Sequence, residues 1–231
     1  MYVTAIVPAA GSGSRMAGSL PKQFLRVRGV PLLARTLMAL RAAGEIQTLI
    51  LVVPAGQEDR CRDEILLPFG LSVDGLVTGG EDRQASVFAG VQAAPAKTDL
   101  ILVHDGARPF VTPEIIRQAI AAAAEVGGAV VALPVTDTIK RADGDLRVRE
   151  TPSRDELWAA QTPQVFRAGL FREAHARALA EGFRGTDDSA LVERLGSPIR
   201  LVQGSRENLK ITTPADVMLA ELLLARREPG R

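Results

Sequence analysis

The residues near the start of the chain that are best suited to chemistry lie in one glycine-rich segment, residues 8–23, PAAGSGSRMAGSLPKQ. Glycine lets a ligand approach the backbone closely, and the N–H groups of such a loop can line an anion. In the same segment, Arg15 offers a planar guanidinium and Lys22 offers a point charge. Two cations aimed at a phosphorus under attack would stabilise the negative charge that gathers there. We therefore expect this segment to act on a phosphate group.

Two familiar nucleotide-binding patterns nearly match this segment, and each fails at a defining position. A dinucleotide fingerprint would start at Gly11, but Met16 stands where its third glycine is needed. An acidic residue for the ribose is also missing after the apolar run 48–53. Gly13 and Gly18 have the spacing of a P-loop, but Ser-Leu follows in place of Lys-Ser/Thr. These misfits argue against an NAD oxidoreductase and against a P-loop ATPase.

Two further polar segments follow apolar runs and could face the same ligand. VHDGARPF places Asp105 at the end of a buried run, where its carboxylate could hold Mg²⁺ for a polyphosphate. The alternative is a turn aspartate that pairs with Arg108. TGGEDRQASV, residues 78–87, brings Gly80 close to a ligand and places Arg83 and Ser86 at the start of a helical pattern. A plain strand-to-helix turn would have the same composition.

Two cations far along the chain, Arg154 and Lys210, stand out by their context. Arg154 ends a charged hairpin, and Lys210 lies in ENLKITTP between a predicted strand and a predicted helix. If they converge on one pocket, they would hold a second anion, such as a sugar phosphate. Isolated lysines and arginines are more often simply solvated.

The elements that must position these residues alternate between strands and helices. Apolar runs predict strands at residues 3–7, 48–53, 73–77, 100–104, 129–135, 158–166 and 199–202. Apolar spacings of three and four predict helices that include residues 31–43, 84–93 and 114–126. Thr112-Pro113 and Thr213-Pro214 have the pattern of helix starts. We predict an α/β fold, a Rossmann-like, mostly parallel twisted sheet with helices on both faces, in one domain over residues 1–231.

One segment interrupts this alternation, TDTIKRADGDLRVRETPSRDEL at residues 136–157. TIKR and LRVRE alternate with period two on either side of the turn ADGD, so a hairpin is expected. It is too charged on both faces to lie in a core. We predict a projecting β-hairpin arm at about residues 136–158 that pairs two copies of the chain. A solvated surface loop is the alternative.

Composition limits the class of protein. The formal net charge of +1 indicates no general surface for nucleic acid, so any anion site must be local. The chain has one cysteine, which excludes an internal disulfide and favours a reduced, cytoplasmic location. No apolar stretch reaches the roughly 18 residues of a membrane span. Two histidines and one cysteine make a structural zinc cluster unexpected.

Taken together, these segments resemble the 2-C-methyl-D-erythritol 4-phosphate cytidylyltransferases, within the sugar nucleotidyltransferase superfamily. The resemblance runs from about residue 5 to about residue 221 and rests on PAAGSGSRM with PKQ, GGEDRQASV, VHDGARP, PVTDTIKR, LWAAQTPQ, TDDSALVE and NLKITTPADV. It implies transfer of CMP from CTP to 2-C-methyl-D-erythritol 4-phosphate, with Mg²⁺, giving 4-diphosphocytidyl-2-C-methyl-D-erythritol and pyrophosphate for isoprenoid precursor synthesis. It also implies a homodimer formed through the arm.

The resemblance assigns roles to particular residues. Arg15 and Lys22 match the cations that stabilise the transition state, and Arg154 and Lys210 match the pair that positions the substrate phosphate. Nucleotide contacts are matched by Ala10, Gly11, Gly13, Gly80, Ser86, Asp105 and Ala107. Thr162 and Thr186 match positions near the substrate, and Thr138 and Arg154 would reach the partner's site through the arm. No general base is needed, because the attacking phosphate oxygen is already an anion.

Other functions stay open at this point. A ribitol 5-phosphate cytidylyltransferase would share most of these segments. A nucleotide-binding regulator without catalytic activity would bind CTP but release no pyrophosphate, although the set of Arg15, Lys22 and Asp105 argues against it.

Overall fold

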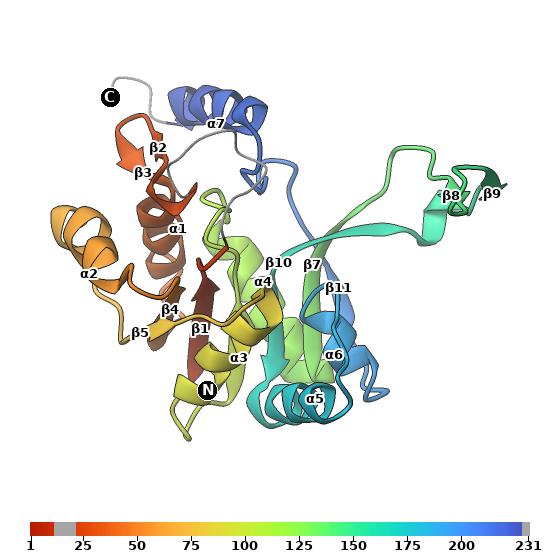
Figure 1. The fold of residues 1–231 in the computed structure, drawn as a ribbon, viewed down its shortest axis with the longest axis horizontal. Helices are drawn as coiled ribbons and strands as arrows, with labels where there is room; N and C mark the ends of the chain where they lie inside the picture. The colour runs from red at the N-terminus through yellow and green to blue at the C-terminus, as the bar shows by residue number, and fades with distance from the viewer. Residues whose placement is uncertain (12–21, 228–231) are drawn as a thin grey trace.

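A seven-stranded sheet with the strand order β11-β7-β10-β6-β1-β4-β5 forms the centre of the molecule (Figure 1). The computed structural model describes residues 1–11 and 22–227. Strand β10 runs antiparallel to both of its neighbours, and the other neighbouring pairs are parallel. The strands are β1 (Val3–Pro8), β4 (Thr48–Val53), β5 (Gly75–Thr78), β6 (Leu100–Val103), β7 (Gly128–Pro134), β10 (Trp158–Arg167) and β11 (Arg200–Gln203). The predicted fold, a mostly parallel α/β sheet, is confirmed.

Helices cover both faces of this sheet, which is why its strands are nearly continuous apolar runs. On β1, Ala5 and Val7 belong to the core under α1 (Leu32–Arg41) and α4 (Pro113–Val126). Ile6, between them, faces the opposite core. That second core is completed by α3 (Arg83–Ala93), α5 (Ala168–Ala180) and α6 (Ser189–Glu193). Short helices α2 (Glu58–Cys61), η2 (Arg62–Leu66) and η3 (Leu67–Phe69) flank the first core.

Both predicted helix starts are present. Thr112 Oγ1 accepts a hydrogen bond from the backbone N–H of Ile115 at 3.3 Å, at the start of α4. At the start of α7 (Pro214–Arg227), Thr213 Oγ1 accepts from the N–H of Asp216 at 3.3 Å. Asp216 Oδ2 accepts from the N–H of Thr213 at 2.7 Å in return. These are the two reciprocal bonds of a capping box.

Helix α1 begins at Leu32, one residue later than predicted, because the preceding residue takes part in a small hairpin. Pro31 is extended and belongs to β3 (Val30–Pro31), which pairs with β2 (Arg26–Val27). Arg28 and Gly29 make the turn with φ values of 49° and 78°. This two-residue turn needs left-handed backbone at both positions, and the arginine gave no sequence signal for it.

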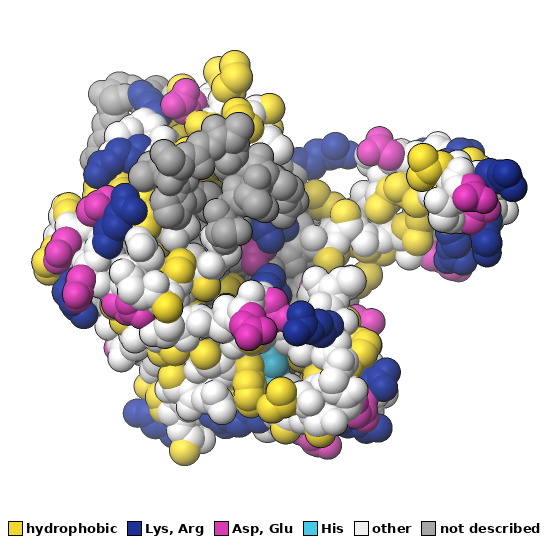
Figure 2. All heavy atoms as spheres, in the orientation of Figure 1, with side chains coloured by type: hydrophobic (Ala, Val, Ile, Leu, Met, Phe, Trp, Pro, Cys, Tyr) yellow, Lys and Arg dark blue, Asp and Glu magenta, His cyan; other side chains and the backbone are white. Residues whose placement is uncertain are grey.

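The segment between β7 and β10 projects from the sheet as an arm, as predicted (Figure 1). Its hairpin, β8 (Arg141–Ala142) with β9 (Val148–Glu150), is shorter than the alternating pattern predicted. The reason is Asp143, whose Oδ1 accepts backbone N–H groups of Asp145 and Arg147, both at 3.0 Å, and so widens the turn. Lys and Arg side chains gather at the outer end of the arm (Figure 2). The pairing of two copies through this arm stays a prediction.

Among the helices of the described residues, none has the length and apolar character that crossing a membrane requires.

Candidate functional site

The chain order creates a crevice at the carboxyl ends of β1 and β6. From β1 the chain passes to β4 and β5 on one side, and it then returns to place β6 on the other side of β1. Loops that leave two neighbouring parallel strands in opposite directions leave a gap between them, where open α/β sheets bind their ligands. Residues 9–11, after β1, and residues 105–107, after β6, border this gap.

A cavity of about 360 Å³ occupies this position. Among the described residues, its lining includes seven that the sequence predicted, namely Ala10, Gly11, Gly80, Ser86, Asp105, Ala107 and Lys210. Gly79 allows the loop between β5 and α3 to pack against the residues that follow β1. A Cβ atom at Gly79 would lie 2.6 Å from Ala10 Cβ and 2.8 Å from Ser86 Oγ. Ser86 Oγ accepts from the N–H of Gly80 at 3.2 Å, which fixes this loop over the cavity.

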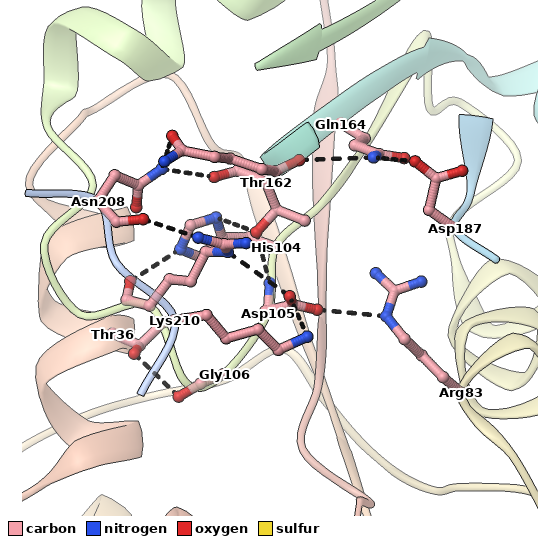
Figure 3. Close-up of polar contacts among 12 residues, drawn as sticks. Thr36, Arg83, His104, Asp105, Gly106, Thr162, Gln164, Asp187, Asn208 and Lys210 are labelled. Atoms are coloured by element: carbon pink, nitrogen blue, oxygen red, sulfur yellow. Dashed lines mark hydrogen bonds and ion pairs between the residues drawn. The ribbon is translucent and has the colours of Figure 1, made fainter. Parts of the chain in front are cut away.

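The carboxylate of Asp105 lies at the floor of the cavity among three cations (Figure 3). Lys210 Nζ lies 2.7 Å from Oδ2, Arg83 Nε lies 3.2 Å from Oδ1, and Arg108 Nε lies 3.6 Å from Oδ2. Burial alone would raise the pKa of Asp105, but the charges of Arg83 and Lys210 outweigh it and hold the pKa well below its usual range. Asp105 therefore carries its negative charge throughout the physiological pH range.

A buried chain of hydrogen bonds fixes the backbone on which Asp105 stands. The N–H of Asp105 donates to Thr162 Oγ1 at 3.0 Å. The Thr162 hydroxyl can then donate to His104 Nδ1 at 3.1 Å, and His104 Nε2–H can donate to the backbone oxygen of Arg108 at 3.0 Å. This network assigns a neutral His104 with its proton on Nε2. Burial favours the same state, because it lowers the pKa of His104 to about 4.

Lys210 is positioned by a buried asparagine two residues before it. Asn208 Nδ2 donates to the backbone oxygen of Thr162 at 2.8 Å and to Gln161 Oε1 at 3.2 Å. The backbone oxygen of Asn208 accepts from Arg108 Nη1 at 2.7 Å. These bonds tie the segment before α7 to β10 and to the loop after β6. Lys210 therefore lies at the cavity, but in this chain it does not meet Arg154 there, so the predicted convergence of these two cations stays a prediction.

The carboxylate of Asp105 lies at the cavity floor, and its two oxygens pair with Lys210 and Arg83. Among the described residues, no three His, Cys, Asp or Glu side chains gather into a metal-binding cluster. Mg²⁺ is commonly held by one or two carboxylates together with substrate phosphate oxygens. Asp105 can supply one such carboxylate, provided that phosphate oxygens complete the coordination.

Several predicted site residues do not line the cavity in this chain. Arg154, in η4 (Arg154–Glu156) at the base of the arm, is exposed and donates to the backbone oxygen of Thr136 at 3.1 Å. Thr138 is exposed on the arm, and Thr186 is exposed before α6. Thr162 lies beneath the cavity, where it supports Asp105.

Three other predicted residues cannot be placed at the cavity. Gly13 and Arg15 lie outside the described residues. Lys22 begins the short helix η1 (Lys22–Phe24), and its side chain is likewise outside what the structure describes.

Sequence reasoning missed the importance of Arg83 and did not mark Asp188. Arg83 Nη2 lies 2.7 Å from Asp188 Oδ2, and Asp188 is only 2% exposed. A doubled aspartate before a helical pattern, TDDSALVE, was the available signal. The same pattern is typical of a solvated helix start, so composition could not predict the contact between Asp188 and Arg83.

Comparison with known proteins gives one consistent family. The family model "IspD: 2-C-methyl-D-erythritol 4-phosphate cytidylyltransferase" matches residues 3–226. A protein with that enzyme name from Geobacter metallireducens is 46% identical over 233 residues, covering 99% of this chain and 100% of the relative. Another from Caldanaerobacter subterraneus is 45% identical and covers 97% of this chain and 99% of the relative.

Solved structures agree with these relatives. The 2-C-methyl-D-erythritol 4-phosphate cytidylyltransferase of Thermus thermophilus is 38% identical with a TM-score of 0.79, over 96% of this chain and 98% of that one. The 4-diphosphocytidyl-2C-methyl-D-erythritol synthase of Anaerococcus prevotii is 34% identical with a TM-score of 0.86, over 97% of this chain and 99% of that one. With matches over nearly its whole length, the chain belongs to the 2-C-methyl-D-erythritol 4-phosphate cytidylyltransferases, which are nucleotidyltransferase enzymes.

Proposed function

We propose that the cavity binds CTP and that the chain transfers its CMP group to 2-C-methyl-D-erythritol 4-phosphate. An oxygen of the acceptor phosphate attacks the α-phosphorus, and pyrophosphate leaves with the bonding electrons of the broken P–O bond. The observation that carries the proposal is the Asp105 carboxylate, fixed between Lys210 and Arg83 at the switch point of a chain of this family. In this assignment Ala10, Gly11, Gly13, Gly80, Ser86, Asp105 and Ala107 contact the nucleotide.

Catalysis in this proposal comes from orientation and electrostatics. The acceptor phosphate is already an anion, so the protein must align it with the α-phosphorus and offset the growing charge. Arg15 and Lys22 are assigned to the charge of the transition state, and Lys210 to the acceptor phosphate. The short distance from Lys210 Nζ to Asp105 supports the last role, because it holds the ammonium at the cavity floor before substrate arrives.

Asp105 is also the residue that we assign to a divalent cation, Mg²⁺ or a similar ion. Such an ion would neutralise part of the triphosphate charge and polarise the reacting phosphorus. Asp105 stays ionised and is held on a rigid backbone, which suits it to this task. Chelation with excess EDTA should then stop turnover, and added Mg²⁺ should restore it.

We assign the arm to a homodimer in which Thr138 and Arg154 act at the cavity of the other copy. Both residues are exposed and absent from the cavity lining of their own chain among the described residues. Exposed apolar side chains on the arm, such as Leu146 and Val148, offer surface for pairing. We also propose a cytoplasmic location, supported by the presence of a single cysteine, which can form no disulfide within the chain.

The acceptor can be tested by pyrophosphate release with CTP, Mg²⁺ and a panel of 2-C-methyl-D-erythritol, ribitol and hexose phosphates. We expect the highest kcat/KM with 2-C-methyl-D-erythritol 4-phosphate and CTP. A preference for ribitol 5-phosphate would overturn the acceptor. CTP binding with no pyrophosphate release from any acceptor would instead indicate a regulator.

A further inference from the structure

Arg83, in the first turn of α3, joins two carboxylates that come from different parts of the fold. Its Nε lies 3.2 Å from Oδ1 of Asp105, a contact that Figure 3 shows as a dashed line, and Asp105 lines the cavity. Its Nη2 lies 2.7 Å from Oδ2 of Asp188, which comes directly before α6 and is buried. The planar guanidinium can hold both because its N–H groups point in fixed, different directions.

The residues on either side of Arg83 bind the segment that leads to Asp188, residues 183–188. Gln84 Nε2 donates to the backbone oxygen of Phe183 at 3.0 Å, and Gln84 Oε1 accepts from the N–H of Gly185 at 2.9 Å. Asp82 is the N-cap of α3 and accepts the N–H of Ala85 through Oδ1. Its Oδ2 lies 3.1 Å from Arg184 Nη1. The first turn of α3 therefore contacts the cavity on one side and the segment that carries Thr186 on the other.

Residues 187–189 are also connected to Asp105 by hydrogen bonds through β10. Gln164 on β10 donates through Nε2 to Asp187 Oδ2 at 2.8 Å and accepts through Oε1 from the N–H of Ser189 at 3.0 Å. Figure 3 shows Gln164 pointing toward Asp187 from the strand that also carries Thr162. Thr162 in turn holds the backbone of Asp105. Arg83 thus closes a ring of contacts that links α3, residues 187–189, β10 and the cavity floor.

From this ring we infer that Arg83 is a positioning residue that couples the nucleotide cavity to residues 183–188 through Asp105 and Asp188. The inference rests on the proposed function, because it takes CTP as the ligand of the cavity. Asp188 has no place in the cavity lining among the described residues. Of the two routes around the ring from Asp188 to Asp105, the one through Arg83 is direct, and we assign the effect of Asp188 on CTP binding to it. Without Asp188 the guanidinium loses one of its two anchors, and Asp105 is held less firmly.

Calorimetric titration of CTP with Mg²⁺, in the absence of any acceptor, tests this coupling in a double-mutant cycle. The four proteins are the unmodified chain, Asp188→Asn, Arg83→Gln and the double variant. We expect each single variant to raise the dissociation constant of CTP about tenfold, and the double variant to match Arg83→Gln alone. Arg177→Gln is the control, because Arg177 makes an exposed pair with Glu181 on α5, and it should leave CTP binding unchanged.

The outcomes separate the coupling from the proposed function. Unchanged CTP affinity in Asp188→Asn, or effects that multiply in the double variant, would overturn the coupling. Failure of the unmodified chain to bind CTP would overturn the proposed function itself. If Arg83→Gln does not fold, Arg83→Lys takes its place in the cycle, since lysine keeps the charge but cannot present the same fork of donors. A further readout is kinetic, because loss of coupling should raise the KM for both substrates more than it lowers kcat.

Discussion

At the scale of single residues, Asp105 is a countercharge to the three cations that lie around it. Lys210, Arg83 and Arg108 would repel one another in an empty pocket, and the carboxylate between them offsets that repulsion. An ammonium that is already in place needs no rearrangement when negative charge develops on a substrate. The ion pair with Asp105 therefore supports the role that we propose for Lys210, which is to hold the acceptor phosphate.

His175 is the second buried histidine, and it should make the stability of the fold depend on pH. Its ring stacks on Phe88 at 5.4 Å and meets the edge of Phe171 at 4.6 Å, and its Nε2 has no hydrogen-bond partner among the described residues. Burial, with a smaller effect from the charge of Arg83, lowers the pKa of His175 to about 4. Below its unfolded pKa the unfolded chain gains a proton that the folded chain cannot hold.

The free energy of unfolding should therefore fall as the pH drops from about 6.5 towards about 4. For His175 alone, the loss between about pH 7.5 and about pH 5 is roughly 2 kcal/mol. His175→Phe keeps a ring in the aromatic stack and should reduce the loss over this interval by that amount. Urea unfolding at both pH values measures it. An equal loss in the two proteins would show that His175 does not titrate as described.

Single residues differ in how far the sequence could locate them. Asp105 and Lys210 were found because each sits beside a recognisable element, a buried run or a capped helix. The contact of Arg83 with Asp188 could not be found, since it joins residues 105 positions apart. Pairing at such a distance is decided by the packing of α3 against the segment before α6, and no local pattern encodes it.

At the scale of elements, the close packing of α3 on the sheet determines where the second polar loop lies. Gly90 allows this approach, because a Cβ atom there would lie 2.5 Å from Ile6 Cγ2 and 3.2 Å from Val52 Cγ2. The same helix begins beside the cavity with its N-cap Asp82 and Arg83. A shift of α3 away from β1 would therefore move the cavity wall.

Gly90→Ala should destabilise the fold by about 1–2 kcal/mol, the cost of overpacking less the gain in helix propensity. The matched control is Gly169→Ala in α5, where a Cβ atom would meet nothing within 4 Å. That control should stabilise the fold by up to about 1 kcal/mol. Urea unfolding of both variants measures these changes. Similar values for both would show that α3 does not pack as tightly as described.

The sequence predicted all seven strands of the central sheet but not how each of them pairs. Every predicted strand is present with ends shifted by at most two residues, because apolar runs and turn residues mark strands locally. The antiparallel direction of β10 has no such mark. No local pattern marks the register shift of β10 between Ala160 and Gln164 either, and Thr162 lies within that shift. Bulges of this kind redirect side chains, and here Thr162 reaches the backbone of Asp105.

At the scale of the whole molecule, the arm separates two groups of residues that the proposed reaction needs together. Lys210 lines the cavity, while Arg154 lies in η4, bonds to the backbone oxygen of Thr136 and does not line the cavity. Leu146 is 87% exposed on the arm, and Val148 is 61% exposed. Apolar side chains left uncovered on a projecting hairpin favour pairing with a second copy.

Mixed dimers test whether the arm acts at the other copy. Lys210→Ala and Arg154→Ala should each be nearly inactive alone. Co-assembly in equal amounts should recover about a quarter of the unmodified activity, because half of the dimers are mixed and each has one intact site. As a control, Arg154→Ala with Thr138→Val should recover nothing, since both sites of that mixed dimer receive a defective arm. Recovery in neither mixture would mean that the arm does not act in trans.

The central claim, that the cavity around Asp105 and Lys210 transfers CMP, is tested most directly by the fate of a radioactive α-phosphate in CTP. With 2-C-methyl-D-erythritol 4-phosphate and Mg²⁺, the label should appear in 4-diphosphocytidyl-2-C-methyl-D-erythritol, and the pyrophosphate should be unlabelled. Lys210→Met keeps the apolar stem and should lower the rate of this transfer about 100-fold while the protein stays folded. Label retained in CTP by the unmodified enzyme, or transfer by Lys210→Met at the unmodified rate, would contradict the account.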